Sequence, residues 1–114
     1  MTETVNAGWE LPEELRNLAV DGDREVVDEL IALFKKDVGV RLQVLRKAVA
    51  TGDIATAGAQ AHAIKGSAIQ MGAVNLVATC RHIELDAGHH VAGNLERLLS
   101  EAEAEMRVLG ATMR

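Results

Sequence analysis

The sequence predicts an all-α fold, an antiparallel up-down-up-down four-helix bundle with a short extra helix at its N-terminus. The chain is rich in Ala, Leu and Glu and holds a single proline, a composition that favours helix over sheet. Apolar residues recur at steps of three and four in four successive stretches, and no stretch alternates with a period of two. The 114 residues fit a single domain.

Residues 1–10 show no sustained periodicity, and we expect a flexible N-terminal tail there, followed by one domain over residues 11–114. Pro12 stands where the first turn of a helix tolerates proline. Glu13 and Glu14 follow it, where the helix dipole favours acids. Asp21 and Gly22 end this first helix after about two turns.

The four long helices follow from apolar stripes and from the residues that bound them. Asp23 and Asp53 are placed to cap the first two of these helices, and Gly52, Gly72 and Gly88 to end the first three. The predicted inward residues are, in chain order, Val27, Ile31, Phe34, Val38, Leu42, Leu45 and Val49; Ile54, Ala57, Ala61, Ile64, Ala68 and Met71; Leu76, Val77, Cys80, Ile83 and Leu85; and Leu95, Leu98, Leu99, Ala102, Met106 and Leu109.

Charge and composition argue against several kinds of partner. The net charge is −5 and no cluster of Lys and Arg appears, so we expect no nucleic-acid binding. The longest apolar runs are too short to span a bilayer, so we expect no membrane insertion. Cys80 is the only cysteine and excludes an intramolecular disulfide; with no recognisable signal peptide, this predicts a cytoplasmic protein. We expect a monomer.

A patch around His62 carries the chemistry. His62 lies off the inward stripe of its helix, and Lys65 and Gly66 follow at three and four residues, so all three share one surface. Glycine inside a helix costs about 1 kcal/mol relative to alanine, and bare backbone beside an imidazole would let another protein approach it. The alternative is a plain surface histidine, a solvated lysine and a glycine that permits helix packing, as Gly58 could.

The string His62-Ala-Ile-Lys-Gly-Ser-Ala, followed by Met71-Gly72-Ala73, resembles the signature of histidine phosphotransfer (HPt) domains, and the similarity extends over about residues 23–110. The resemblance implies a phosphorelay protein whose His62 accepts a phosphoryl group from a receiver-domain aspartate and passes it to another receiver. Lys65 and Gly66 match the pair that flanks the phosphorylated histidine. The family is not itself catalytic, so the resemblance implies no enzyme activity and no cofactor, with Mg²⁺ supplied by the receiver.

The resemblance also points to the residues around the acceptor. Glu84 matches a position that often carries Glu or Gln opposite the histidine, where it can fix the tautomer; the alternative is a loose ion pair with Arg81 or Arg97. The partners implied are response-regulator receiver domains and a hybrid histidine kinase. Residues assigned to the receiver-binding surface are Ser67, Ile69, Leu15 and Leu18, although the two leucines could instead cover the end of the core.

Other hypotheses remain open at this point. His82, His89 and His90 suggest a metal site only weakly, because no cysteine or carboxylate stands at zinc-ligand spacing, and we expect no metal. A receiver-binding adaptor that is never phosphorylated is disfavoured by the intact His62 motif. The chain could also be the phosphoacceptor domain of a larger hybrid or chemotaxis-type kinase, although it carries no dimerisation or ATP-binding segment.

Overall fold

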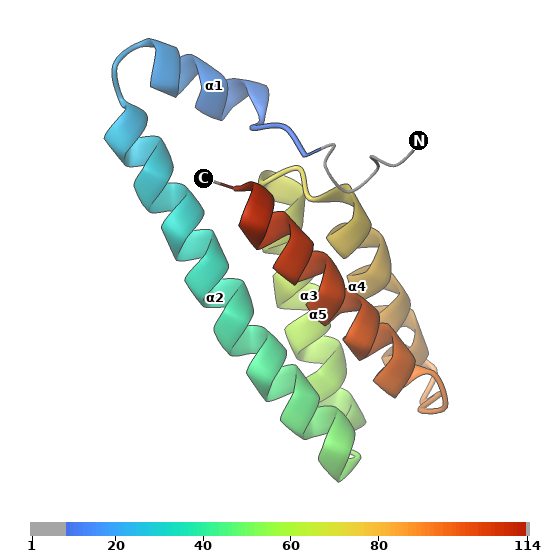
Figure 1. The fold of residues 1–114 in the computed structure, drawn as a ribbon. Helices are drawn as coiled ribbons and strands as arrows, with labels where there is room; N and C mark the ends of the chain where they lie inside the picture. The colour runs from blue at the N-terminus through green and yellow to red at the C-terminus, as the bar shows by residue number, and fades with distance from the viewer. Residues whose placement is uncertain (1–8, 114) are drawn as a thin grey trace.

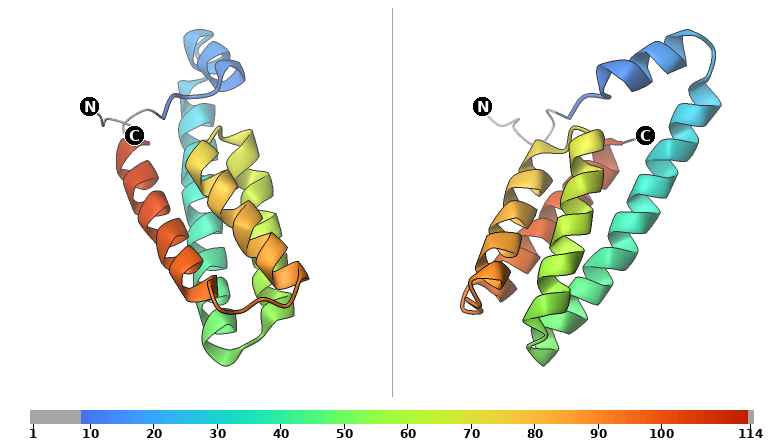
Figure 2. Two further views of the ribbon diagram at one scale, coloured as in Figure 1. Left: turned by 90° about the vertical axis from the view of Figure 1, so that its right-hand side faces the viewer. Right: turned by 180° about the vertical axis from the view of Figure 1, so that it is seen from behind.

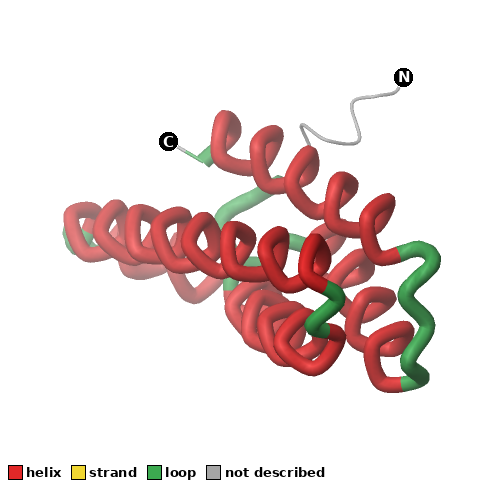
Figure 3. Tube along the Cα trace, turned by 90° about the horizontal axis from the view of Figure 1, so that it is seen from below, coloured by secondary structure: helices red, strands yellow, loops and turns green. Residues whose placement is uncertain are grey.

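The computed structural model describes residues 9–113, and every regular element in that range is an α-helix (Figures 1 and 3). The predicted all-α class is confirmed. In chain order the helices are α1 (Glu13–Val20), α2 (Arg24–Thr51), α3 (Ile54–Gln70), α4 (Val74–Gly88) and α5 (Leu95–Thr112).

The four long helices form the predicted antiparallel bundle. Helix α2 packs against α3 and α5, and α4 packs against the same two helices, so α2 lies diagonally opposite α4. The short α1 contacts α2 and runs back across one end of the bundle (Figure 2). This end also holds the turn between α3 and α4, so α1 lies beside the C-terminus of α3.

Local signals set the helix ends largely as predicted. The side chain of Asp53 accepts a hydrogen bond from the backbone N–H of Thr56 (3.1 Å), which caps α3. Gly52 and Gly72 take φ values of 75° and 68°, a region that favours glycine. Asp23 occupies the capping position of α2, but its side chain makes no capping hydrogen bond.

The core is aliphatic apart from Phe34, and the predicted stripes supply nearly all of it. Leu85 is the exception, with 54% of its surface exposed. The inward face of α4 runs through Ile83 and Ala87, which are four residues apart, and two residues beyond Ile83 the helix has turned by about 200°. The expectation that Leu85 points inward was therefore wrong.

The expected flexible tail covers residues 1–10, of which 1–8 lie outside the described residues. Trp9 packs against the core, and its indole Nε1 donates a hydrogen bond to the carbonyl oxygen of Met71 (2.9 Å). The packed part of the chain therefore includes Trp9, whose isolated position in the sequence gave no periodic signal.

A partly buried acid lies between α4 and α5. The hydroxyl of Thr79 donates a hydrogen bond to Oε2 of Glu105 (3.0 Å), while the buried Oε1 has no hydrogen-bond partner among the described residues. Burial is the main cause that raises the pKa of Glu105, and it outweighs the opposing effect of the Thr79 bond. The folded state therefore holds this proton more tightly than the unfolded chain does.

Glu105→Gln is expected to flatten the pH dependence of stability in weak acid. Because the pKa of Glu105 is raised by folding, the wild type loses stability as pH rises from the ordinary carboxyl range through the raised value. Urea unfolding at several pH values, followed by circular dichroism, measures the difference. The free energy of unfolding of the variant, relative to that of the wild type, should increase as pH rises toward 7. If the free energy of unfolding depends on pH equally in both proteins, Glu105 ionises as freely in the folded state as in the unfolded chain.

No helix in the described part of the chain is both long and apolar enough to cross a membrane.

Candidate functional site

The outer face of α3 presents an open imidazole. Ala61 and Ile64 are completely buried, and they fix the rotation of the helix so that His62 points away from the core. The side chain of His62 is 69% exposed. Gly66 and Ile69 follow at four and seven residues, so they lie along the same exposed face.

A single carboxylate from the neighbouring helix joins the two polar side chains of the motif. Oε2 of Glu84 on α4 lies 2.6 Å from Nδ1 of His62, and its Oε1 lies 2.6 Å from Nζ of Lys65. Glu84 is half-buried, as is Lys65, whereas His62 is open to solvent. The three side chains therefore form one network across α3 and α4.

The ionisation of Glu84 determines which nitrogen of His62 is free. The hydrogen bond from Lys65 is the largest cause that lowers the pKa of Glu84, and His62 lowers it further, although burial opposes both. An ionised carboxylate only accepts hydrogen bonds, so Nδ1 must be the donor. In the neutral imidazole, Nε2 then carries the lone pair and faces solvent.

The contact between Glu84 and His62 is the one expected from the resemblance. The alternative partner Arg97 instead pairs with Glu101 on its own helix (2.7 Å). Lys65 differs from the expectation, because its ammonium group lies on Glu84 rather than free beside the imidazole. The positive charge is nevertheless within one helical turn of His62.

Two glycines of α3 have different surroundings. A Cβ added at Gly58 would lie 3.1 Å from Cβ of Ala87 on α4, so this glycine permits close helix packing. A Cβ added at Gly66 would meet nothing within 4 Å. Packing within the described chain thus explains why position 58 is glycine. No packing contact in the described chain requires glycine at position 66.

Alanine substitutions at the two glycines should have different effects on the stability of the domain. Gly66→Ala is expected to stabilise the domain by up to about 1 kcal/mol, since alanine is the better helix former and meets no neighbour. Gly58→Ala should lose most or all of that gain, because α3 and α4 must separate slightly. Chemical unfolding of both variants measures the contrast, and a destabilised Gly66→Ala would reveal a packing role.

The family model of the Hpt domain matches residues 29–111, which is most of the chain. The chain belongs to the Hpt domain family. Histidine phosphotransfer in a phosphorelay is accordingly its function. The crystal structure of histidine-containing phosphotransfer protein B from Pseudomonas aeruginosa PAO1 is similar to it, with 24% identity, 90% coverage of each chain and a TM-score of 0.80. No curated protein sequence matches the chain.

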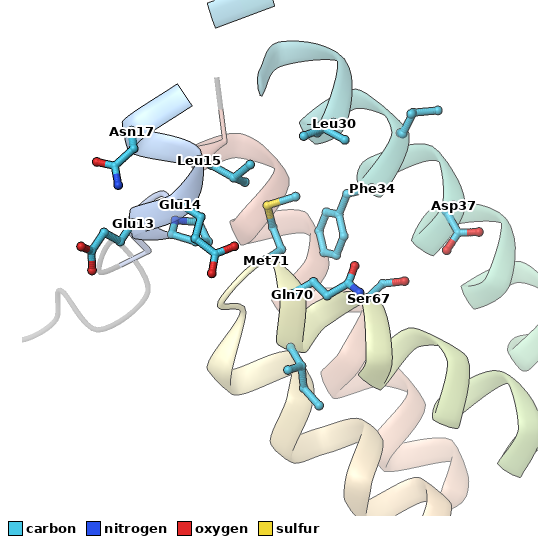
Figure 4. A pocket seen from close by; sticks show the side chains of 13 residues that line it. Glu13, Glu14, Leu15, Asn17, Leu30, Phe34, Asp37, Ser67, Gln70 and Met71 are labelled. Carbon is cyan, nitrogen blue, oxygen red and sulfur yellow. The ribbon is translucent and has the colours of Figure 1, made fainter. Parts of the chain in front are cut away.

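In this HPt domain, three of the four residues assigned to receiver binding meet at one pocket. Leu15, Ser67 and Ile69 line a hollow between α1, α2 and the end of α3 (Figure 4). Ile69 is 56% exposed, whereas Leu15 is half-buried against the core. Leu18 is also packed against the core and is not among the lining residues, so it fits the alternative of covering the end of the bundle.

Two exposed apolar residues that line the pocket were missed in the sequence. Leu30 and Leu33 on α2 are exposed, yet they line the same pocket of the HPt domain. They belong to a second apolar series at positions 26, 30, 33 and 44, each one residue before a member of the inward stripe. This displaced series was the signal that could have indicated them.

The remaining histidines of the HPt domain, within the described residues, do not form a cluster that could bind a metal ion. His82 lies exposed on α4, and His89 and His90 follow the end of that helix. Within residues 9–113, no group of three or more His, Cys, Asp or Glu side chains is arranged to hold a metal ion.

Proposed function

We propose that His62 is the phosphoacceptor, which takes a phosphoryl group on Nε2 from the aspartyl phosphate of one receiver domain and passes it to another. The observation that carries this proposal is the exposed imidazole whose Nδ1 is held by Glu84, so that its other nitrogen faces solvent. The match of His62-x-x-Lys65-Gly66 to the family signature supports it.

The proposed step requires little from this chain beyond position and charge. The Nε2 lone pair attacks phosphorus, and the bond between phosphorus and the aspartate oxygen breaks, so the electron pair leaves with the carboxylate. The imidazole becomes positively charged in the product. Glu84 accepts a hydrogen bond from Nδ1–H and stabilises that charge, which makes it a positioning residue. We expect charge neutralisation by Mg²⁺ to come with the receiver and propose no cofactor for this chain.

Lys65 is proposed to offset phosphoryl charge once His62 is modified. Lys65 lies one turn away on the same side of α3, and its side chain is 21% exposed. Because the same ammonium neutralises Glu84, Lys65 balances a carboxylate before transfer and can share its charge with the phosphoryl group afterwards.

The direct test is a transfer assay with phosphorylated receiver domains. Label should move to the HPt domain and show the stability of phosphohistidine, which is lost in acid and retained in base. A panel of receivers from the same genome, with a hybrid kinase to load them, also identifies the proposed partners. Failure of every receiver to label the chain would contradict a relay function and favour an unphosphorylated adaptor.

Lys65→Ala is expected to shorten the lifetime of phosphohistidine or slow transfer by about two- to fivefold, the range of an exposed charge pair. Added salt should narrow the difference from the wild type, because it screens exposed charges. Lys65→Arg, which retains the charge, is the matched control. Identical decay of phosphohistidine in all three proteins would show that Lys65 serves only to hold Glu84.

A further inference from the structure

The segment that precedes the four-helix bundle, residues 9–22, is attached to it at both ends. Gly22, with a φ of 98°, forms the turn into α2. At the other end, the indole Nε1 of Trp9 donates a hydrogen bond to the carbonyl oxygen of Met71 (2.9 Å), in the turn between α3 and α4. We call this segment, which includes α1, the strap. Figure 2 shows α1 running across one end of the bundle.

The strap buries less of its surface than any other helical part of the described chain. None of the eight residues of α1 is buried, whereas each of the four long helices has at least four buried residues. The apolar side chains of Leu11, Leu15, Leu18 and Ala19 pack against the core, but they are only partly buried. Val20, the last residue of α1, is 85% exposed, and no side chain caps the first turn.

The helical form of α1 depends on its contact with the bundle. An isolated helix shorter than about 12 residues is marginal in water, because few hydrogen bonds offset the entropy cost of its first turn. With eight residues, α1 is therefore helical only while its apolar side packs on the other helices. Loss of that packing should unfold the whole of α1 together, as in other weakly held segments that open locally.

The bundle has a core of its own without the strap. Every buried member of the apolar core lies between Val27 and Met113. The family model matches residues 29–111, so the shared part of the fold also begins after α1. Opening of the strap therefore leaves the main source of stability in place.

The docked strap covers an apolar end of the bundle. Leu15 points toward Phe34 and Met71, which are each only 6% exposed (Figure 4). Release of the strap would expose part of both side chains. It would not disturb the contacts of His62, whose Nδ1 is held by Glu84 on α4.

We propose that the strap is a reversible cover, which opens and closes as a unit while the four-helix bundle stays folded. The device is regulatory, because a protein that contacts docked α1 binds only the closed form. Its apparent affinity is then reduced by the fraction of molecules that are open, and its binding shifts the population toward the closed form. The inference does not depend on phosphorylation of His62, since it concerns the end of the bundle and not the imidazole.

Trp9 reports the state of the strap directly, because it is the only tryptophan in the chain. Its fluorescence is recorded during a urea titration, together with far-ultraviolet circular dichroism, which is dominated by the four long helices. In the wild type, the emission should change to that of a solvent-exposed indole at a lower urea concentration than the loss of helix.

Two variants should separate the two transitions further. Leu18→Ala should move the fluorescence transition to lower urea and leave the dichroism transition unchanged, because Leu18 packs on the core from the strap. Ile83→Val is the control within the bundle, since it removes one methyl group from a side chain that is 1% exposed. It should move the dichroism transition to lower urea and leave the fluorescence transition in place.

Amide hydrogen exchange tests the attachment by Trp9. Trp9→Phe retains an aromatic ring but lacks the donor to Met71, and it should speed exchange of the α1 amides by about fivefold, within the range of one net hydrogen bond. The amides of α3 should exchange as in the wild type. An equal increase in α1 and α3, or no increase in α1, would contradict the proposed attachment.

The urea titration can overturn the proposal in two ways. Coincident fluorescence and dichroism transitions in the wild type, or equal shifts of both in Leu18→Ala, would make α1 part of the cooperative core. Emission typical of an exposed indole before any urea is added would show that the strap has no docked form in solution.

Discussion

His62→Gln is expected to abolish phosphoryl acceptance and to change stability by less than about 0.5 kcal/mol, as usual for an exposed position. The side chain is 69% exposed, so the substitution leaves the core intact. The amide of glutamine can still donate to Glu84, which retains the charge network, but it has no nucleophilic nitrogen. Transfer from a phosphorylated receiver measures the loss, and circular dichroism checks the helix content.

His82→Gln is the matched control for this variant. His82 is exposed on α4, and its replacement should leave both transfer and stability unchanged. Label retained in His62→Gln would exclude His62 as the acceptor. The variants of His82, His89 and His90 would then identify the modified residue.

The fold was predictable because the spacing of apolar residues determines which face of each helix is buried. Ala57, Ala61, Ile64 and Ala68 are all fully buried, as their spacing requires. The errors come from residues that periodicity does not govern. Leu85 is apolar but off the stripe, and Trp9 is held by one hydrogen bond and packing from a chain end.

The site was predictable from spacing only for residues that are close together in the sequence on one helix. His62, Lys65 and Gly66 share a patch because helical geometry places residues three and four apart together. No spacing connects Glu84 to them, since it comes from α4, and only the family resemblance indicated it. That Lys65 would lie on the same carboxylate was not anticipated from either source.

The pocket depends on tertiary packing and therefore escaped sequence reasoning in part. Leu30 and Leu33 are exposed residues on one flank of α2, and they line a hollow only because α1 lies beside that flank. Nothing in a helical repeat fixes the direction in which a short helix leaves the bundle. The direction of α1 is set by contacts such as those of Trp9 and Leu15.

Gly66→Gln is expected to slow phosphoryl transfer by about 100-fold, the loss that a misplacement of about 1 Å produces in a reacting pair. Side chains on a helix lean toward its N-terminus, so a glutamine at position 66 extends back over the turn that carries His62. The start of this side chain fits the structure, since a Cβ at Gly66 meets no neighbour within 4 Å. The new side chain would thus occupy the approach of the receiver and not disturb the bundle.

Ala59→Gln provides the matched control. Ala59 is exposed and lies three residues before His62, so the same glutamine there leans away from the imidazole. The rate of phosphoryl transfer to Ala59→Gln should be within about threefold of the wild-type rate. The rate for Gly66→Ala should be within the same range, because one methyl group leaves most of the approach to His62 open. Rapid-quench measurement of transfer, with receiver affinity measured separately, distinguishes blocked docking from a slower chemical step. If Gly66→Gln transfers as fast as Ala59→Gln, Gly66 does not serve as clearance, and its destabilising presence in α3 would need another cause.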